Sequence, residues 1–135
     1  MDEHISIVIK EAEKTFEDAK FLLEGKRYGS AINRAYYAAF HCAQALIRSK
    51  EIFTKTHAGT HSKFGELFVK TDLFPKDIGE YLKRLAGYRT AADYTYEVSV
   101  SPKIASQSVD YAQKFLAQTK KYFEEQDSIE TDKEE

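Results

Sequence analysis

Apolar residues recur three and four positions apart along most of the chain, the spacing that places them on one face of an α-helix. The first such segment covers residues 2–24 and carries, with charged residues between them, Ile5, Val8, Ile9, Ala12, Phe16, Ala19, Leu22 and Leu23. Gly25 then stands where a left-handed helix cap is easiest for glycine. The pattern predicts a first amphipathic helix that ends at about Glu24.

Four further helices follow from the same pattern. Residues 28–50 are covered on most sides by small and aromatic residues, so we expect a second, central helix. A connection over 51–59 leads to a short third helix over 60–71, with Thr60 as its expected N-cap. A fourth helix is predicted over 75–98, and Ser101 with Pro102 begins the fifth.

The fold class that follows is all-α, because no tight-hairpin signal and no long alternation of period two occurs. We expect an up-and-down helical bundle of about five helices, with one short crossing helix. A length of 135 residues suits one domain, predicted over residues 1–126. Residues 127–135 are acidic and nearly devoid of apolar side chains, which predicts a disordered tail.

The composition indicates which ligands the protein can bind and in which compartment it works. The formal charge is −2, so contact with nucleic acid would need a local basic patch. The single cysteine, Cys42, excludes an internal disulfide and has the apolar context of a buried thiol. No apolar run approaches the length of a membrane span, and the start of the chain does not resemble a signal peptide. A cytoplasmic protein without membrane contact is expected.

A short polar run, Arg89-Thr90-Ala91-Ala92-Asp93-Tyr94, is the strongest candidate for chemistry. Arg89 and Asp93 are four residues apart in a predicted helix, so they share a face and can pair, and Tyr94 flanks the pair. An arginine can bind a phosphate or a carboxylate through its planar fork of donors. We therefore place a candidate catalytic or binding group at Arg89, Asp93 and Tyr94.

The second helix carries another polar cluster, formed by Asn33, Arg34, Tyr37 and His41. The last three lie along one side of the helix by their spacing. Because buried polar groups need partners, Arg34 or Tyr37 could pair with Asp93 across the bundle. These residues are predicted to line a cleft. The alternative is a structural hydrogen-bond network that only fixes the register of the helices.

Other kinds of site find little support. His57 and His61 have a spacing that can hold zinc when both are helical, but they straddle a glycine and a predicted helix start and lack a third ligand. Anchoring of the loop beside Gly59 is the favoured role of His57. No nucleophile elbow and no phosphate-binding glycine loop occurs. We expect no metal and no cofactor.

Three segments together resemble the HEPN superfamily, and more narrowly an uncharacterised prokaryotic branch of it. They are residues 27–41 (RYGSAINRAYYAAFH), residues 56–59 (THAG) and residues 89–94 (RTAADY), and they occur in the order found in that branch. The resemblance covers most of the chain. It implies a helical bundle that forms a homodimer. It also implies work beside a minimal nucleotidyltransferase in a toxin–antitoxin pair.

In RNA-cleaving HEPN proteins the arginine is followed, after four to six residues, by a histidine, and two subunits form a composite cleft. Histidine can transfer protons near neutral pH and arginine can bind the phosphate. Here Arg89 matches the arginine, but the histidine positions hold Tyr94, Thr95 and Tyr96. Tyrosine, with a reference pKa of about 10, is a poor base at pH 7. The departure weakens the case for RNA cleavage.

Three interpretations stay open on the sequence. The first is a dimeric HEPN-type module with a polar cleft that acts with a nucleotidyltransferase partner in a toxin–antitoxin-like or RNA- or nucleotide-associated system. The second is a metal-independent endoribonuclease with a divergent active site. The third is a structural helical interaction protein whose polar residues fix the register.

Overall fold

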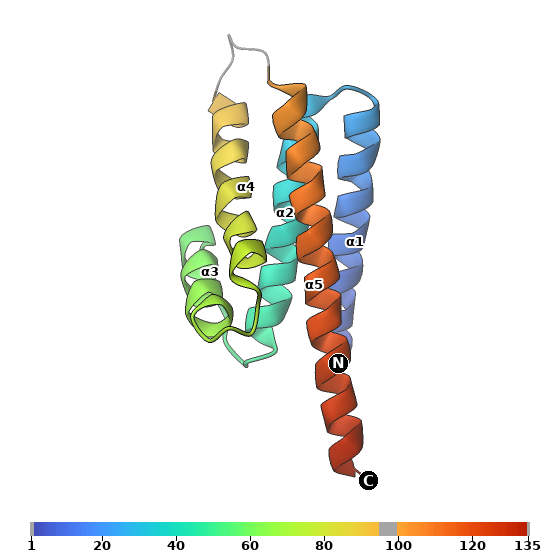
Figure 1. Cartoon of the computed structure of the whole chain (residues 1–135), viewed down its shortest axis with the longest axis vertical. Helices are drawn as coiled ribbons and strands as arrows, with labels where there is room; N and C mark the ends of the chain where they lie inside the picture. The colour runs from blue at the N-terminus through green and yellow to red at the C-terminus, as the bar shows by residue number, and fades with distance from the viewer. Residues whose placement is uncertain (1, 95–99, 135) are drawn as a thin grey trace.

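The computed structural model describes residues 2–94 and 100–134, and all of its regular elements are helices. They are α1 (Glu3–Glu24), α2 (Tyr28–Arg48), α3 (His57–Phe64), the π-helical turn η1 (Gly65–Val69), α4 (Lys76–Tyr94) and α5 (Pro102–Glu134). Helices α1 and α4 run in one direction, and α2 and α5 run in the other (Figure 1). The predicted all-α, up-and-down bundle is confirmed.

Helix α2 lies at the centre of the bundle and packs against α1, α5, α4 and α3. Six alanines of α2 are fully buried, and side chains of this size let neighbouring helices approach closely. They are Ala31, Ala35, Ala38, Ala39, Ala43 and Ala45. The face of α2 that is only half buried carries Asn33, Arg34, Tyr37, His41, Gln44 and Arg48. We call these six residues the polar face of α2.

The end of α1 corrects one prediction. Gly25 has an ordinary φ of −79°, and the left-handed residue is Lys26, with φ of 61°. The N–H of Arg27 then donates to the carbonyl of Leu22 at 2.8 Å, which is the closing hydrogen bond of a Schellman motif. Gly25 therefore belongs to the end of the helix, and a lysine takes the position that glycine usually fills.

The short third helix also begins earlier than predicted. Thr56, not Thr60, is its N-cap, and the Thr56 hydroxyl accepts a hydrogen bond from the N–H of Gly59 at 2.9 Å. Thr60 is buried and hydrogen-bonds to the Thr54 hydroxyl at 2.7 Å. His57 is consequently the first residue of α3 and not part of a connection. It lies one turn before His61, on the same helix.

The fifth helix begins as predicted, because the Ser101 hydroxyl lies 3.4 Å from the N–H of Ile104. It then continues to Glu134, so that the described part of the acidic segment after residue 126 is helical. In Figure 1 this end of α5 extends past the other helices. Whether the segment acts as a tail outside the domain stays a prediction.

The core is rich in aromatic rings. Phe64 packs against Phe68, Phe74 and Phe115, with ring centres 5.3–5.8 Å apart, and joins α3, η1 and α5. Cys42 is fully buried on α2, as predicted. Burial raises the pKa of the Cys42 thiol to about 12. None of the helices within the described ranges has the length and apolar character to cross a membrane.

Candidate functional site

Arg89 lies near the end of α4, where aromatic rings hold its guanidinium. Its Cζ is 4.9 Å from the centre of the Tyr36 ring and 5.6 Å from that of Tyr37, both on α2. Its Nη1 contacts Oδ2 of Asp93 at 3.4 Å, so the pair predicted from the spacing is present. Its Nε is buried and has no hydrogen-bond partner among the described residues. The Arg89 side chain as a whole is 25% exposed.

The Tyr36 hydroxyl joins two histidines beneath Arg89. It lies 3.1 Å from Nδ1 of His57 and 3.0 Å from Nε2 of His61. The two imidazole planes are inclined by only 29° and 13° to the phenol ring, which suits hydrogen bonds in the ring plane. His57 also stacks on Phe40, with ring centres 4.3 Å apart. These contacts fix the first turns of α3 against α2.

The protonation states of this group follow from its burial. Desolvation raises the pKa of the Tyr36 phenol to about 12, although the charge of Arg89 acts in the opposite direction. Desolvation lowers the pKa of His61 below 6.5, and His57 and Arg89 lower it further. At neutral pH the Tyr36 hydroxyl therefore keeps its proton and the His61 imidazole is uncharged.

The two polar clusters predicted from the sequence meet at one hollow. Asn33, Arg34, Asp93 and Gly29 line it together with Leu22 and Ala92. Nε and Nη2 of Arg34 both donate to Oδ1 of Asn33, at 3.0 and 2.7 Å, and the guanidinium lies 5.1 Å from the Tyr37 ring. The carboxylate of Asp93 pairs with Arg89, so the predicted pairing of Asp93 with Arg34 or Tyr37 is wrong.

His41 and Tyr94 lie apart from this group. His41 is half buried on α2, and its ring centre is 6.4 Å from that of Tyr37. Tyr94 is 76% exposed at the end of α4 and makes no ring contact within the described part of the chain. Thr95 and Tyr96, at the other positions where histidine was expected, lie outside the described residues. A functional role for His41 or Tyr94 stays a prediction.

The sequence prediction missed Tyr36, His57 and His61 as members of the site. The sequence does indicate that the two histidines lie together, because they are four positions apart and that spacing puts both on one side of a helix. Placing the start of the helix at Thr60 hid this signal. Tyr36 stands beside the predicted Tyr37, and only the packing shows which hydroxyl points at α3.

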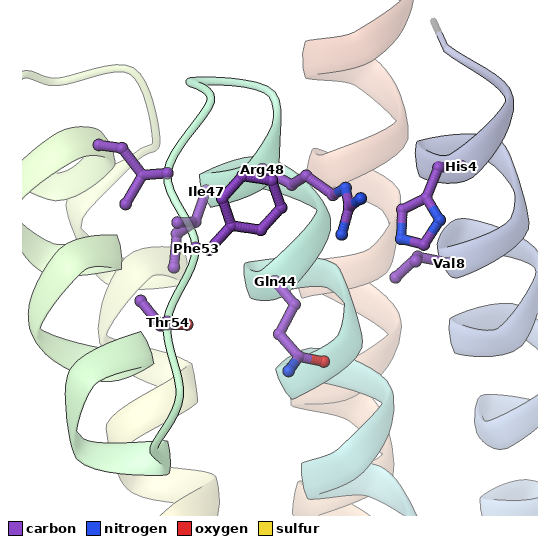
Figure 2. Close-up of a pocket in the computed structure, with 8 residues that line it drawn as sticks. His4, Val8, Gln44, Ile47, Arg48, Phe53 and Thr54 are labelled. Atoms are coloured by element: carbon purple, nitrogen blue, oxygen red, sulfur yellow. The ribbon is translucent and has the colours of Figure 1, made fainter.

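A separate hollow lies at the other end of the polar face of α2 (Figure 2). Arg48 stacks on Phe53, with its Cζ 4.7 Å from the ring centre, and His4, Val8 and Gln44 line the same hollow. No cluster of three or more metal-ligating side chains occurs among residues 2–94 and 100–134. His57 and His61 therefore form a pair without a third protein ligand in that part of the chain.

Comparison with known proteins places the chain in a family. A family model of the HEPN domain matches residues 5–122. The Methanocaldococcus jannaschii protein named "Putative toxin MJ0605" is 36% identical over 91% of this chain and 91% of its own length. A second protein of that organism, "Putative toxin MJ0142", is 34% identical over 85% of this chain and 78% of its own length. A UPF0332 protein of Thermotoga maritima is 32% identical over 86% and 88%.

A solved structure has the same fold. The crystal structure of TT1696 from Thermus thermophilus superposes with a TM-score of 0.76, at 20% identity, over 90% of this chain and 99% of that one. With the family match and the curated relatives, the predicted resemblance is confirmed: the chain belongs to the HEPN domain family.

Proposed function

We propose that this protein is the toxin member of a toxin–antitoxin pair and that it acts on RNA through Arg89 and the neighbouring hollow lined by Arg34 and Asp93. The names of its relatives in Methanocaldococcus jannaschii support the class of system. The geometry supports the target, because the partly exposed Arg89 pairs with Asp93, and Asp93 lines a hollow together with a second arginine, Arg34.

The observation that carries the proposal is the way Arg89 is held. Aromatic faces and one long contact to Asp93 position the guanidinium but satisfy few of its five N–H donors. A planar guanidinium matches the oxygens of a phosphate with two parallel hydrogen bonds. A phosphate that approaches the exposed edge of Arg89 would gain donors that the protein itself leaves available.

RNA fits this site better than a purely protein ligand does. The site combines two arginines with the exposed or half-buried rings of Tyr37 and His57, and such rings can stack on unpaired bases. Because the net charge of the chain is −2, the positive groups act locally and not through an overall basic surface. We expect single-stranded RNA to bind with a strong dependence on salt.

Two partners complete the proposed system. Membership of the HEPN family supports a homodimer in which two copies bring their Arg89 sites to one cleft. It also supports a minimal nucleotidyltransferase as the second protein of the pair. Mass measurement of the purified protein in solution, alone and with such a partner, tests both assignments.

The direct test is RNA binding by the Arg89→Ala variant. Loss of charge-assisted hydrogen bonds to phosphate costs about 1.5–3 kcal/mol, so we expect roughly 10- to 100-fold weaker binding. Fluorescence anisotropy with a labelled single-stranded RNA of mixed sequence measures the affinity of each variant for RNA. Arg89→Lys should retain part of the affinity, because it keeps the charge but loses the planar fork.

Arg84→Ala is the matched control, because it removes the same charge from α4 at an exposed position where Arg84 contacts Tyr111. We expect less than a two-fold change in RNA binding. Equal effects of the two variants would show that only overall charge matters. If Arg89→Ala instead lowers the free energy of unfolding by several kcal/mol in urea, Arg89 is a structural partner and the proposal fails.

A further inference from the structure

We propose that His57 and His61, joined by the Tyr36 hydroxyl, are the general acid and base with which this protein cleaves the RNA bound at Arg89. The proposal rests on the proposed function, since it needs RNA at this site. It supplies the proton-transfer groups that the sequence lacks at positions 94, 95 and 96. It would make the protein a metal-independent endoribonuclease.

The number of protons in the group fixes which atoms donate and which accept. A tyrosine hydroxyl has one proton to donate, and a neutral imidazole carries one proton on one of its two nitrogens. Tyr36 therefore donates to the inner nitrogen of one histidine and accepts from the inner N–H of the other. The first histidine must carry its proton on the outer nitrogen, and the second must have a bare outer nitrogen.

Whichever way the Tyr36 hydroxyl points, the neutral group thus has one proton donor and one proton acceptor at its two outer nitrogens. The outer nitrogens are Nε2 of His57 and Nδ1 of His61, and neither has a hydrogen-bond partner among the residues that the structure describes. Cleavage of RNA needs one group of each kind. When both rings are neutral, the arrangement provides both.

The position of the group relative to Arg89 also fits. The guanidinium lies 4.9 Å from the centre of the ring that carries the shared hydroxyl. His57 is exposed to solvent, and the half-buried His61 lines a hollow between α3, η1 and α4, so both rings can be reached from outside. The link between Arg89 and the histidines is Tyr36, whose ring lies under the guanidinium and whose hydroxyl contacts both imidazoles, and the charge of Arg89 acts on His61.

The proposed reaction is transfer of the phosphoryl group within the RNA. The bare outer nitrogen takes the proton of a ribose 2′-hydroxyl, and the 2′-oxygen forms a bond to phosphorus. The bond from phosphorus to the 5′-oxygen breaks, and that oxygen takes the outer proton of the other histidine. The products are a 2′,3′-cyclic phosphate and a free 5′-hydroxyl, and no oxidant, reductant or metal is consumed.

The Tyr36 hydroxyl moves the compensating protons within the same step, so that no imidazolate forms. The histidine that gained a proton passes its inner proton to the Tyr36 oxygen, and Tyr36 passes its own proton to the other histidine. Both rings are then neutral again, with their roles exchanged. Tyr36 acts as a positioning and relay residue, and His57 and His61 are the catalytic residues.

The charged and titratable groups around the pair decide its response to pH. On the elements that face the histidines they are Tyr37, Lys63, Glu66, Lys70, Glu80, Lys83, Arg89 and Asp93. Protonation of His61, whose pKa lies below 6.5, breaks the arrangement of one proton donor and one acceptor, so cleavage should fall at acidic pH. The pKa of Tyr36 is raised to about 12, so the rate should stay level from about pH 7 to 9.

The test uses the full chain, a labelled single-stranded RNA and a DNA of the same sequence, in the presence of EDTA. We expect the RNA to be cut to products with cyclic phosphate ends, seen by mass spectrometry, and the DNA to remain intact. His57→Asn and His61→Asn should each cut about 100-fold more slowly or worse, and His61→Asn should bind RNA within two-fold of wild type. His4→Asn is the control and should cut at the wild-type rate.

Tyr36→Phe distinguishes a proton-relay role of Tyr36 from a purely structural role. It keeps the ring beneath Arg89 but removes the hydroxyl that links the two histidines. We expect slower cleavage and a bell-shaped dependence on pH in place of the plateau. Thermal melting checks that each variant is folded, and His57→Gln and His61→Gln replace any asparagine variant that is not.

The outcomes separate this proposal from the proposed function. RNA that binds in an Arg89-dependent way but is not cut would overturn the proposal and leave the proposed function standing. Cleavage that survives both histidine substitutions, or that EDTA abolishes, would also overturn it. Absence of Arg89-dependent binding would overturn the proposed function itself.

Discussion

Arg89 is the residue on which the site depends, and the way it is held has an energetic consequence. A guanidinium over an aromatic face is stabilised by about 0.5–2 kcal/mol, depending on how far it is desolvated. The two tyrosine rings of α2 supply this contact without using its hydrogen-bond donors. The residue is therefore fixed in position before any ligand arrives, which reduces the entropy lost on binding.

His61 gives a prediction about pH and stability. Its folded-state pKa is lowered below 6.5, mainly by burial, so the folded protein binds this proton more weakly than the unfolded chain does. The stability that the protein gains from keeping His61 uncharged is fully present above about pH 6.5. It is lost as the pH falls from 6.5 toward the pKa of His61 in the folded protein. We expect the free energy of unfolding, measured in urea, to fall between pH 7.5 and 5.5.

Carboxylates and other histidines also contribute to that fall, so the variant His61→Asn isolates the contribution of His61. It should be less stable than wild type at pH 7.5, because the hydrogen bond to Tyr36 is lost, but should lose less stability on acidification. His4→Asn, at an exposed position on α1, should keep the wild-type pH dependence. An unchanged slope in His61→Asn would contradict the assignment.

At the scale of elements, the packing of η1 against α4 depends on a glycine. A Cβ atom on Gly79 would lie 2.7 Å from Cγ2 of Val69, closer than real Cβ contacts allow. Val69 is β-branched and stiff, so the two elements would have to separate. Because η1 follows α3 directly and packs against both α3 and α4, the distance between η1 and α4 bears on the position of α3 and its two histidines.

The pair Gly79→Ala and Gly87→Ala measures this packing. Both glycines lie within α4, and alanine favours a helix by about 1 kcal/mol over glycine at either position. A Cβ on Gly87 meets no atom within 4 Å, so Gly87→Ala should be stabilising. Gly79→Ala should be less stable than Gly87→Ala by about 1–3 kcal/mol, the usual cost of overpacking.

Chemical denaturation of the two variants checks the prediction. Gly79→Ala should also alter the site, because α3 moves with η1, whereas Gly87→Ala should leave RNA binding unchanged. Equal gains in stability for the two variants would mean that Val69 moves aside at no cost. In that case the distance between η1 and α4 does not control the position of the histidines.

For the molecule as a whole, stability should reside in the aromatic core that joins α3, η1 and α5. Phe115 is fully buried there, with ring centres 5.3 and 5.4 Å from Phe64 and Phe74. Phe115→Ala should lower the free energy of unfolding by about 3–5 kcal/mol. Phe21→Ala removes the same side chain from α1 where it is 75% exposed, and should change stability by less than about 0.5 kcal/mol.

Urea unfolding followed by circular dichroism compares the two phenylalanine variants. A single transition in both, with an unchanged slope against urea, is expected of one cooperative domain. Two separate transitions in Phe115→Ala would show that α3 and η1 unfold independently of the rest. The site would then depend on a local unit and not on the whole bundle.

The fold was largely predictable because periodicity and caps are local properties of the sequence. Ser101 and Pro102 mark the start of α5, and the stripe of α1 from Ile5 onward ends at Glu24 as expected. The start of α3 was not predictable with equal ease, since Thr56 and Thr60 are both good N-caps. Only the buried contact of Thr60 with Thr54 decides between them.

The site was predictable in part for the same reason. The spacing of Arg89 and Asp93 on one helix indicates their contact, and it is present. The group of Tyr36, His57 and His61 joins residues more than twenty positions apart, and no local pattern encodes a contact of that kind. Its discovery required the packing of α3 against α2.

The buried thiol of Cys42 makes the molecule convenient for covalent labelling. It is the sole cysteine of the chain, and a thiol with a pKa of about 12 hardly reacts with maleimides at neutral pH. Any cysteine introduced on the surface would then be the one that reacts. Dyes or cross-linkers can be attached at chosen points around the hollow, and distances between two copies measured, without first altering the native residue.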